Sequence, residues 1–237
     1  LLVLISFVFA SLFNVLMSAP PGYVQTKEGV IIYTNPAFTG TVNAVKLEVV
    51  TENIIRVVVA PGKEIIPGKS LVTVYQKKSD LTWKVYHSGE SVSLKTKNLT
   101  AVVNIKTGAV TFLNAKGEQI LTEKPGQSFR PAVFDGKSFY NLTRTFQSVF
   151  GDAWYGLGQH QNGLINYRGQ QTTFFQNNTE VAIPFLVSNK NYGILWDNYS
   201  LTKAGDVRPF HPLSSFQLFS KNGEAGWLTA SYSNNKN

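Results

Sequence analysis

The sequence predicts an all-β fold, and three observations lead to that prediction. Short segments rich in β-branched and aromatic residues alternate with turn signals built from Gly, Pro, Asn and Lys-Gly. After an apolar N-terminal run, no stretch keeps a 3.6-residue hydrophobic period long enough to form a helix. The composition, with 43% hydrophobic and 15% charged residues, 19 Gly and 10 Pro, is typical of a folded, turn-rich chain. Together these observations favour a β-sandwich.

The predicted strands are short segments bounded by breaker residues. Two tight turns, Lys106-Thr107-Gly108 and Ala115-Lys116-Gly117, join successive strands into a meander, because Gly supplies the positive φ that such turns need. The strands are Val30–Thr34, Val42–Val50, Ile54–Ala60, Leu71–Tyr75, Trp83–His87, Val92–Lys97, Thr100–Lys106, Val110–Leu113 and Glu118–Leu121.

The N-terminal residues 1–19 are predicted to be a signal peptide that begins without its initiating Met and basic region. An apolar run ends in the small and breaker residues Ser18, Ala19, Pro20 and Pro21, the pattern of an h-region followed by a cleavage site. The run is shorter than the roughly 20 residues that a membrane helix needs. We therefore expect an exported protein, periplasmic or on the bacterial cell surface, with no membrane span in the mature chain. A buried N-terminal helix is the alternative.

Charge and cysteine content exclude several classes of function. The formal net charge is +8, but the Lys residues are spread along the chain and the longest basic run is Lys77-Lys78, which argues against nucleic-acid binding. The absence of Cys excludes disulfides, thiol nucleophiles and Cys-ligated zinc. Only three His residues remain as imidazole ligands, so we expect no metal and no other cofactor.

The segment from Phe146 to Tyr199 is dense in Gly, Asn, Gln and aromatic residues. Sugars offer hydroxyl groups to amides and apolar C–H faces to aromatic rings, so this composition is compatible with a polyol-binding surface. In the alternative interpretation, the amides close turns and the aromatic residues Trp154, Phe174, Phe175 and Trp196 form sandwich core.

Three carboxyl groups in this segment are candidates for catalysis. Glycoside hydrolysis uses two carboxyls about 5 to 9.5 Å apart, and Asp152, Glu180 and Asp197 are available, although each also fits a turn or a strand end. His160 could orient a ligand or act as a base, or it could simply bond to the backbone of its loop. No GxSxG, HExxH, P-loop or dinucleotide-binding fingerprint occurs.

Four ordered motifs carry a resemblance to a known family. The chain resembles the N-terminal β-sandwich of glycoside hydrolase family 31, and most closely that of exported α-xylosidases from xyloglucan-degrading bacteria. The resemblance covers roughly Val24 to Ala204 and implies a galactose-mutarotase-like sandwich over residues 20–205. The motifs are AWYGLGQHQNG at Ala153–Gly163, FQNNT at Phe175–Thr179, IPFLVS at Ile183–Ser188 and YGILWDNYS at Tyr192–Ser200.

The resemblance also implies that catalysis and substrate binding are carried by different domains. Family members hydrolyse α-glycosidic bonds with retention through two Asp residues on a downstream (β/α)8 barrel. The chain ends at Asn237, before any such barrel, so we expect no catalytic residue here and an inactive isolated fragment. The sandwich of these enzymes supplies a loop over the barrel mouth. That loop matches Gln176, Asn177, Asn178 and Thr179, and Asn178 and Thr179 above all are expected to hydrogen-bond the leaving-group sugar of a xyloglucan oligosaccharide; a solvated turn is the alternative.

Residues 206–237 resemble the opening strands of a protective-antigen-type carbohydrate-binding module that some of these α-xylosidases carry as an insertion. Two classes of function stay open. The first is the N-terminal part of a retaining α-glycosidase, with α-xylosidase favoured over α-glucosidase. The second is a free-standing carbohydrate-binding or structural sandwich. The oligomeric state is left open.

Overall fold

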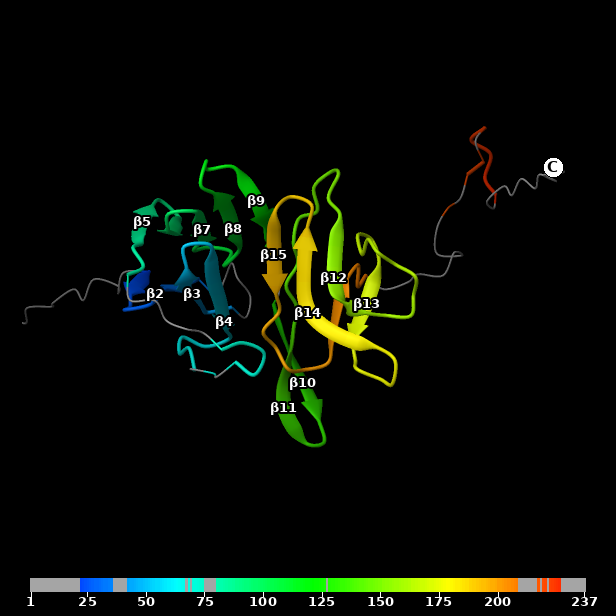
Figure 1. Ribbon diagram of the computed structural model, residues 1–237, viewed down its shortest axis with the longest axis horizontal. Helices are drawn as coiled ribbons and strands as arrows, with labels where there is room; N and C mark the ends of the chain where they lie inside the picture. The colour runs from blue at the N-terminus through cyan, green and yellow to red at the C-terminus, as the bar shows by residue number, and fades with distance from the viewer. Residues whose placement is uncertain are drawn as a thin grey trace, which may run out of the picture.

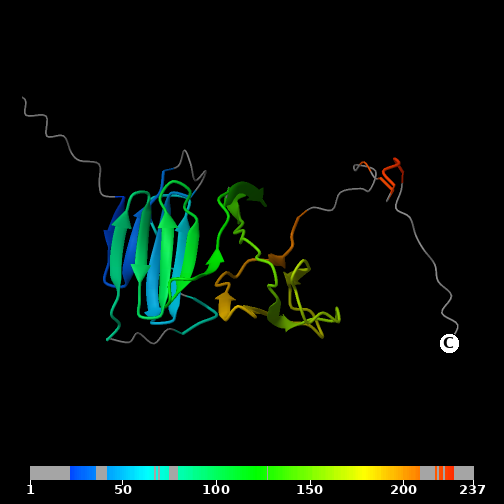
Figure 2. The same ribbon diagram turned by 90° about the horizontal axis from the view of Figure 1, so that it is seen from above.

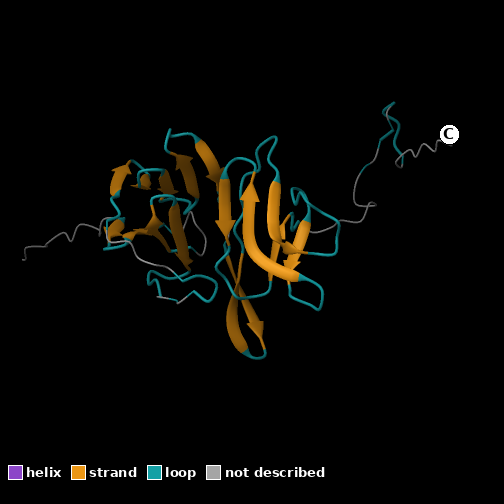
Figure 3. Cartoon of the chain, in the orientation of Figure 1, coloured by secondary structure: helices purple, strands orange, loops and turns teal. Residues whose placement is uncertain are grey.

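The computed structural model describes residues 22–35, 42–66, 68, 70–74, 80–126, 128–208, 217, 219–220 and 222–226. Within these ranges every regular element is a strand, which confirms the predicted all-β class (Figure 3). The predicted signal peptide, residues 1–19, and much of the predicted module, residues 206–237, lie outside the described residues. No helix in the described ranges is long and apolar enough to cross a membrane.

The first half of the chain forms two antiparallel sheets that face each other (Figures 1 and 2). The first sheet has the order β1-β2-β3-β4, with β1 at Tyr23–Gln25, β2 at Gly29–Tyr33, β3 at Ala44–Thr51 and β4 at Ile54–Ala60. The second has the order β5-β6-β7-β8-β9, with β5 at Lys84–Ser88, β6 at Ser91–Lys95, β7 at Leu99–Asn104, β8 at Val110–Asn114 and β9 at Gln119–Thr122.

The core of this sandwich lies between the two sheets. Alternate residues of each strand point inward, so the hydrophobic residues fall at every second position. Leu47 on β3 and Leu94 on β6 are both fully buried, and burial of such a side chain contributes about 1.5–3 kcal/mol. The other fully buried core residues include Val30, Ile32, Val45, Val92, Ala101, Val103 and Val110.

Both predicted turns of the meander are present. Asn104 begins the first, and its Oδ1 accepts the N–H groups of Lys106 and Thr107 at 3.0 Å each. Gly108 and Gly117 have φ values of 65° and 81°, which only glycine adopts without strain.

The predicted strand Leu71–Tyr75 is wrong for the part that is described. Residues 71–74 form an irregular loop. The Ser70 hydroxyl accepts the N–H groups of Val72 and Thr73 at 3.2 and 3.0 Å, and the Leu71 N–H donates to the Tyr199 hydroxyl at 3.0 Å. Side chains therefore take the backbone donors that a neighbouring strand would have used.

The second half of the chain is built from three smaller sheets (Figure 1). The first is a projecting hairpin, the second has the order β12-β14-β15, and the third pairs β13 with β16. The strands are β10 at Phe129–Phe134, β11 at Lys137–Leu142, β12 at Trp154–Gln159, β13 at Gln171–Phe174, β14 at Val181–Ser188, β15 at Tyr192–Leu195 and β16 at Thr202–Gly205.

Ionic contacts connect the two halves. The buried Glu123 carboxylate accepts the Val110 N–H at 2.9 Å and the Arg144 Nε–H at 3.0 Å. After β15, the Asp197 carboxylate accepts hydrogen bonds from Arg56 Nη2 at 3.1 Å and from the Ser70 hydroxyl at 2.8 Å. These contacts fix the end of β15 against β4 and hold the second half beside the sandwich.

Candidate functional site

A bulge in β14 shapes the site, because the three residues Ile183, Pro184 and Phe185 lie opposite the single residue Leu157 of β12. The pairing of β12 with β14 shifts register between Gly156 and Gly158, which leaves Leu157 without a partner in the ladder. Leu157 has a φ of 64°, and the flanking glycines have φ values of 97° and 106°. A Cβ on Gly158 would lie 1.9 Å from the Val181 carbonyl oxygen, and one on Gly156 would lie 2.6 Å from that of Phe185. The two glycines that flank Leu157 therefore allow β12 to approach β14 closely at the bulge.

His160 is fixed by this bulge. Its Nε2 donates to the carbonyl oxygen of Leu157 at 2.9 Å. The ring packs edge-on against the buried Tyr167, with centroids 6.2 Å apart, and the His160 side chain is only 3% exposed. Its other nitrogen, Nδ1, lies 3.7 Å from Oε2 of Glu180. Both ring nitrogens thus face oxygen atoms, which fixes the orientation of the ring.

Glu180 connects His160 to the loop before β14. Its N–H donates to the Asn177 carbonyl oxygen at 2.8 Å, which closes a turn in which Asn178 has a φ of 38°. Its Oε1 accepts the Gln161 N–H at 3.5 Å. Glu180 is therefore joined to the loop through its backbone N–H, and its carboxylate contacts Gln161 and His160.

The predicted leaving-group loop is on the surface. Gln176, Asn177, Asn178 and Thr179 lie between β13 and β14, and all four are exposed. The structure does not bring their side chains into the adjacent cavity, but it places two lining residues, Phe175 and Glu180, at the two ends of the loop.

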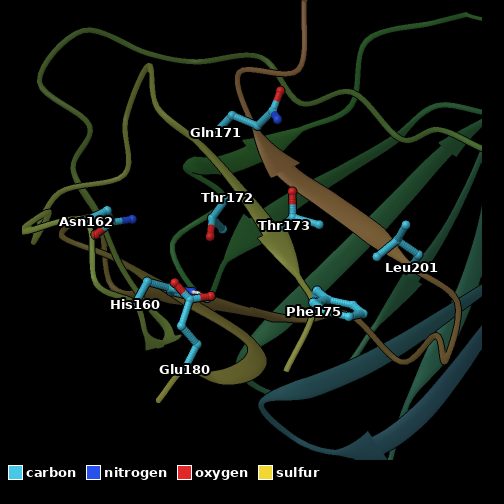
Figure 4. Close-up of a pocket in the computed structure, with 8 residues that line it drawn as sticks. All are labelled: His160, Asn162, Gln171, Thr172, Thr173, Phe175, Glu180 and Leu201. Carbon is cyan, nitrogen blue, oxygen red and sulfur yellow. Dashed lines mark ion pairs between the residues drawn. The ribbon is translucent and has the colours of Figure 1, made fainter. Parts of the chain in front are cut away.

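The cavity beside this loop has a volume of about 440 Å³. Its two sides differ in chemistry: Asn162, His160 and Glu180 are grouped on one side, and Phe175 and Leu201 lie on the other (Figure 4). Gln171, Thr172 and Thr173 from β13 complete the lining.

The three candidate carboxylates lie in separate surroundings. Asp152 is buried and accepts the Ser188 hydroxyl at 3.3 Å and the Val149 N–H at 3.3 Å. Asp197 is bound to Arg56 and Ser70, and only Glu180 lines the cavity. Asp152 and Asp197 therefore have structural roles, as residues of a turn and of a strand end. Across the described ranges, no group of three or more His, Asp or Glu residues is arranged to hold a metal ion.

The aromatic residues of the polar segment divide into two groups. Trp154, Phe174 and Trp196 are half-buried, in line with a packing role, whereas Phe175 is 60% exposed and is not core. The pairing of His160 with Glu180 is absent from the sequence-based expectations. The sequence signal for this pairing is the two glycines, Gly156 and Gly158, within one strand. Such glycines indicate a bulge, where a backbone carbonyl group such as that of Leu157 is left to accept a side-chain hydrogen bond.

A family model described as the glycosyl hydrolase 31 N-terminal galactose mutarotase-like domain matches residues 44–203. The chain belongs to this family. Its sequence is 38% identical over 168 residues to an α-xylosidase of Saccharolobus solfataricus, a match that covers 66% of this chain and 22% of the relative. It is 29% identical over 143 residues to an uncharacterized family 31 glucosidase, ORF2, of Pseudescherichia vulneris, covering 51% of this chain and 27% of the relative.

Solved structures agree with the family assignment. The GH31 α-xylosidase from Xanthomonas citri matches 86% of this chain, with a TM-score of 0.71 and 38% identity, and the match covers 22% of that protein. A GH31 α-xylosidase from a soil metagenome, solved with xylose, matches 76% of this chain and 28% of its own, with a TM-score of 0.63 and 22% identity, which shows the shared fold. The chain thus spans between 22% and 28% of the length of these relatives, and the match is to an N-terminal domain model.

Proposed function

We propose that this chain is the N-terminal domain of a retaining α-xylosidase that acts on xyloglucan oligosaccharides. The observation that supports the proposal most is the 38% identity to the Saccharolobus solfataricus α-xylosidase over 168 residues. The Xanthomonas citri α-xylosidase, with the same identity and a TM-score of 0.71, supports it independently. The two catalytic Asp residues would lie on a barrel outside this chain.

The domain would act by binding the sugar on the leaving-group side of the bond. Gln176, Asn177, Asn178 and Thr179 are exposed, and amide and hydroxyl groups are suited to sugar hydroxyls. The turn closed by Glu180 onto Asn177 holds this loop in one shape, so less conformational entropy is lost when it binds a sugar.

The test is hydrolysis by the protein encoded by the complete reading frame that contains this chain. We expect cleavage of an aryl α-xyloside and of xyloglucan oligosaccharides, with an aryl α-glucoside cleaved at least tenfold more slowly. An enzyme that cleaves neither α-xyloside, or a reading frame without a catalytic barrel, would overturn the proposal.

The loop is tested in the same protein with Asn178→Ala and Thr179→Ala. The double variant is expected to lower kcat/KM for oligosaccharides roughly tenfold, because about 1.4 kcal/mol of hydrogen bonding is lost on the leaving-group side. An aryl α-xyloside has no second sugar, so its kcat/KM should stay within twofold of the unaltered enzyme. Equal losses on both substrates would contradict the assignment of the loop.

α-Glucosidase specificity is the second candidate, and the similarity to the family 31 glucosidase ORF2 supports it. The substrate comparison above separates the two, because a glucosidase would cleave the aryl α-glucoside faster than the α-xyloside. A free-standing carbohydrate-binding sandwich would bind sugar without cleaving either one.

Export and the inserted module remain part of the proposal. Residues 1–19 have the pattern of a signal peptide, so the mature protein recovered outside the cytoplasm should begin near Pro20. A mature protein that retains these residues would contradict the assignment. Within residues 206–237 the described residues include one antiparallel bridge, between Phe219 and Ala225.

A further inference from the structure

The cavity beside the loop combines an apolar side with a hydrogen-bonding side. Phe175 and Leu201 are 60% and 69% exposed, so their apolar surfaces are available to a ligand. Facing them across the cavity are the amide of Asn162 and the carboxylate of Glu180 (Figure 4). A pyranose ring has this same division, with C–H groups on one face and hydroxyls around its edge.

The charge of the cavity selects against anions. None of its eight lining residues is Lys or Arg, and Glu180 contributes a carboxylate. An anionic ligand would meet this carboxylate with no Lys or Arg among the lining residues to offset the repulsion. A neutral hydroxyl group, in contrast, can donate a charge-assisted hydrogen bond to the carboxylate.

The contacts of Glu180 keep its carboxylate in place before a ligand arrives. The carboxylate lies beside His160, and His160 is itself held by the Leu157 carbonyl oxygen and by Tyr167. The Gln161 N–H approaches the other carboxylate oxygen at 3.5 Å. Side chains held in this way lose little rotamer entropy on binding.

We propose that this cavity binds one neutral pyranose ring, with Phe175 against its C–H face and with Glu180 and Asn162 bound to its hydroxyls. The choice of a sugar as the ligand rests on the proposed function. The inference extends that function, because the cavity gives the N-terminal domain a sugar contact outside the loop Gln176–Thr179. Its volume, about 440 Å³, lies within the range of small-molecule sites.

The experiment is a titration of the 237-residue chain, isotopically labelled, followed by NMR. The probes are methyl α-D-xylopyranoside and methyl α-D-glucopyranoside, which differ by one hydroxymethyl group, and sodium glucuronate as the anion. We expect both neutral glycosides to bind with millimolar affinity and to shift the amide signals of Asn162, Thr173 and Glu180. Glucuronate should bind at least fivefold more weakly.

Two substitutions test the roles of the lining residues. Phe175→Ala should weaken binding of the neutral glycosides roughly fivefold, because the stacking contact is lost. Phe150→Ala is the matched control, since Phe150 is 97% exposed and lies outside the cavity, and it should leave the affinity unchanged. Glu180→Gln should let glucuronate bind about as well as the neutral glycosides. Dispersed NMR spectra establish that each variant is folded.

The inference is overturned if no amide signal shifts at 50 mM glycoside, or if the shifts lie away from the cavity. It is also overturned if glucuronate binds the unaltered chain as tightly as the neutral glycosides do, or if Phe175→Ala and Phe150→Ala bind the glycosides with equal affinity. These outcomes are independent of the enzymatic proposal, which is decided by hydrolysis in the complete enzyme. A chain that binds glycosides in an enzyme that cleaves no α-xyloside would support the cavity and overturn the xylosidase assignment.

Discussion

The two halves of the chain use β-strands in different ways. In the first half, β6 alternates between inward hydrophobic residues and outward polar ones, and the inward residues Val45 and Leu47 of β3 and Val92 and Leu94 of β6 are fully buried. In the second half, β14 is apolar on both faces. Its outward residues Val181, Ile183, Phe185 and Val187 are 43%, 50%, 43% and 41% exposed.

This difference separates the part of the chain that gives stability from the part that carries the site. The sandwich of β1 to β9 encloses a core to which Phe129 of β10 also belongs, whereas the β12-β14-β15 sheet leaves an apolar face open in this chain. Leu195 on β15 pairs with Phe185 and extends that face. The bulge, the loop and the cavity all belong to the second half, so the site rests on the less buried part of the molecule.

The largest expected effect tests this difference directly. Leu47→Ala removes a fully buried side chain from the sandwich and should lower the free energy of unfolding by about 2–5 kcal/mol. Ile183→Ala removes a side chain of the same size that is 50% exposed, and should cost under about 1 kcal/mol. Guanidinium unfolding followed by circular dichroism measures both. Equal costs would show that β14 contributes as much to the core as β3 does.

A smaller and more local effect is expected at the bulge. Gly158→Ala places a Cβ 1.9 Å from the Val181 carbonyl oxygen at a residue with φ of 106°, and should destabilise the β12-β14 pairing by about 1–3 kcal/mol. Gly126→Ala is the control, since an added Cβ there meets nothing within 4 Å. Hydrogen exchange should accelerate in β12 and β14 but stay slow in β3 and β6. Faster exchange throughout the chain would contradict a local effect at the bulge.

The strands and turns of the first half show which features the sequence could predict and which it could not. The predicted strand Ile54–Ala60 coincides with β4, because a run of β-branched residues and the flanking turn residues are local signals. The turn at Gly108 was predictable for the same reason. The predicted strand at Leu71 fails because one hydroxyl, that of Ser70, accepts two of the N–H groups.

The candidate site was only partly predictable. The exposure of the loop Gln176–Thr179 follows from its polar, turn-forming residues. The cavity does not follow, because it depends on the register between β12 and β14, which brings His160 beside Glu180. Register is a non-local property, and a shift of one residue would turn each side chain to the opposite face.

The smallest expected effect is a pH dependence in the second half. Burial raises the pKa of Tyr192 above its ordinary value of 10.0, the Ser188 hydrogen bond opposes this shift, and the Asp152 charge adds to it. Because the unfolded chain releases this proton first, the stability linked to Tyr192 is fully present below about pH 10 and is lost as the pH rises through the folded-state pKa. Tyr192→Phe should therefore make the alkaline fall in the free energy of unfolding shallower.

Ser188→Ala gives the opposite test of the same group. Without the hydrogen bond from Ser188, the phenolate is less favoured in the folded state, so the pKa of Tyr192 rises further and the alkaline fall becomes steeper. Both slopes are measured by urea unfolding between about pH 9 and 11, the range around the ordinary tyrosine pKa. Variants whose slopes change in the same direction would contradict the assignment to Tyr192. Opposite changes would confirm Tyr192 on β15 as the half-buried ionisable group, in the half of the molecule that carries the bulge and the cavity.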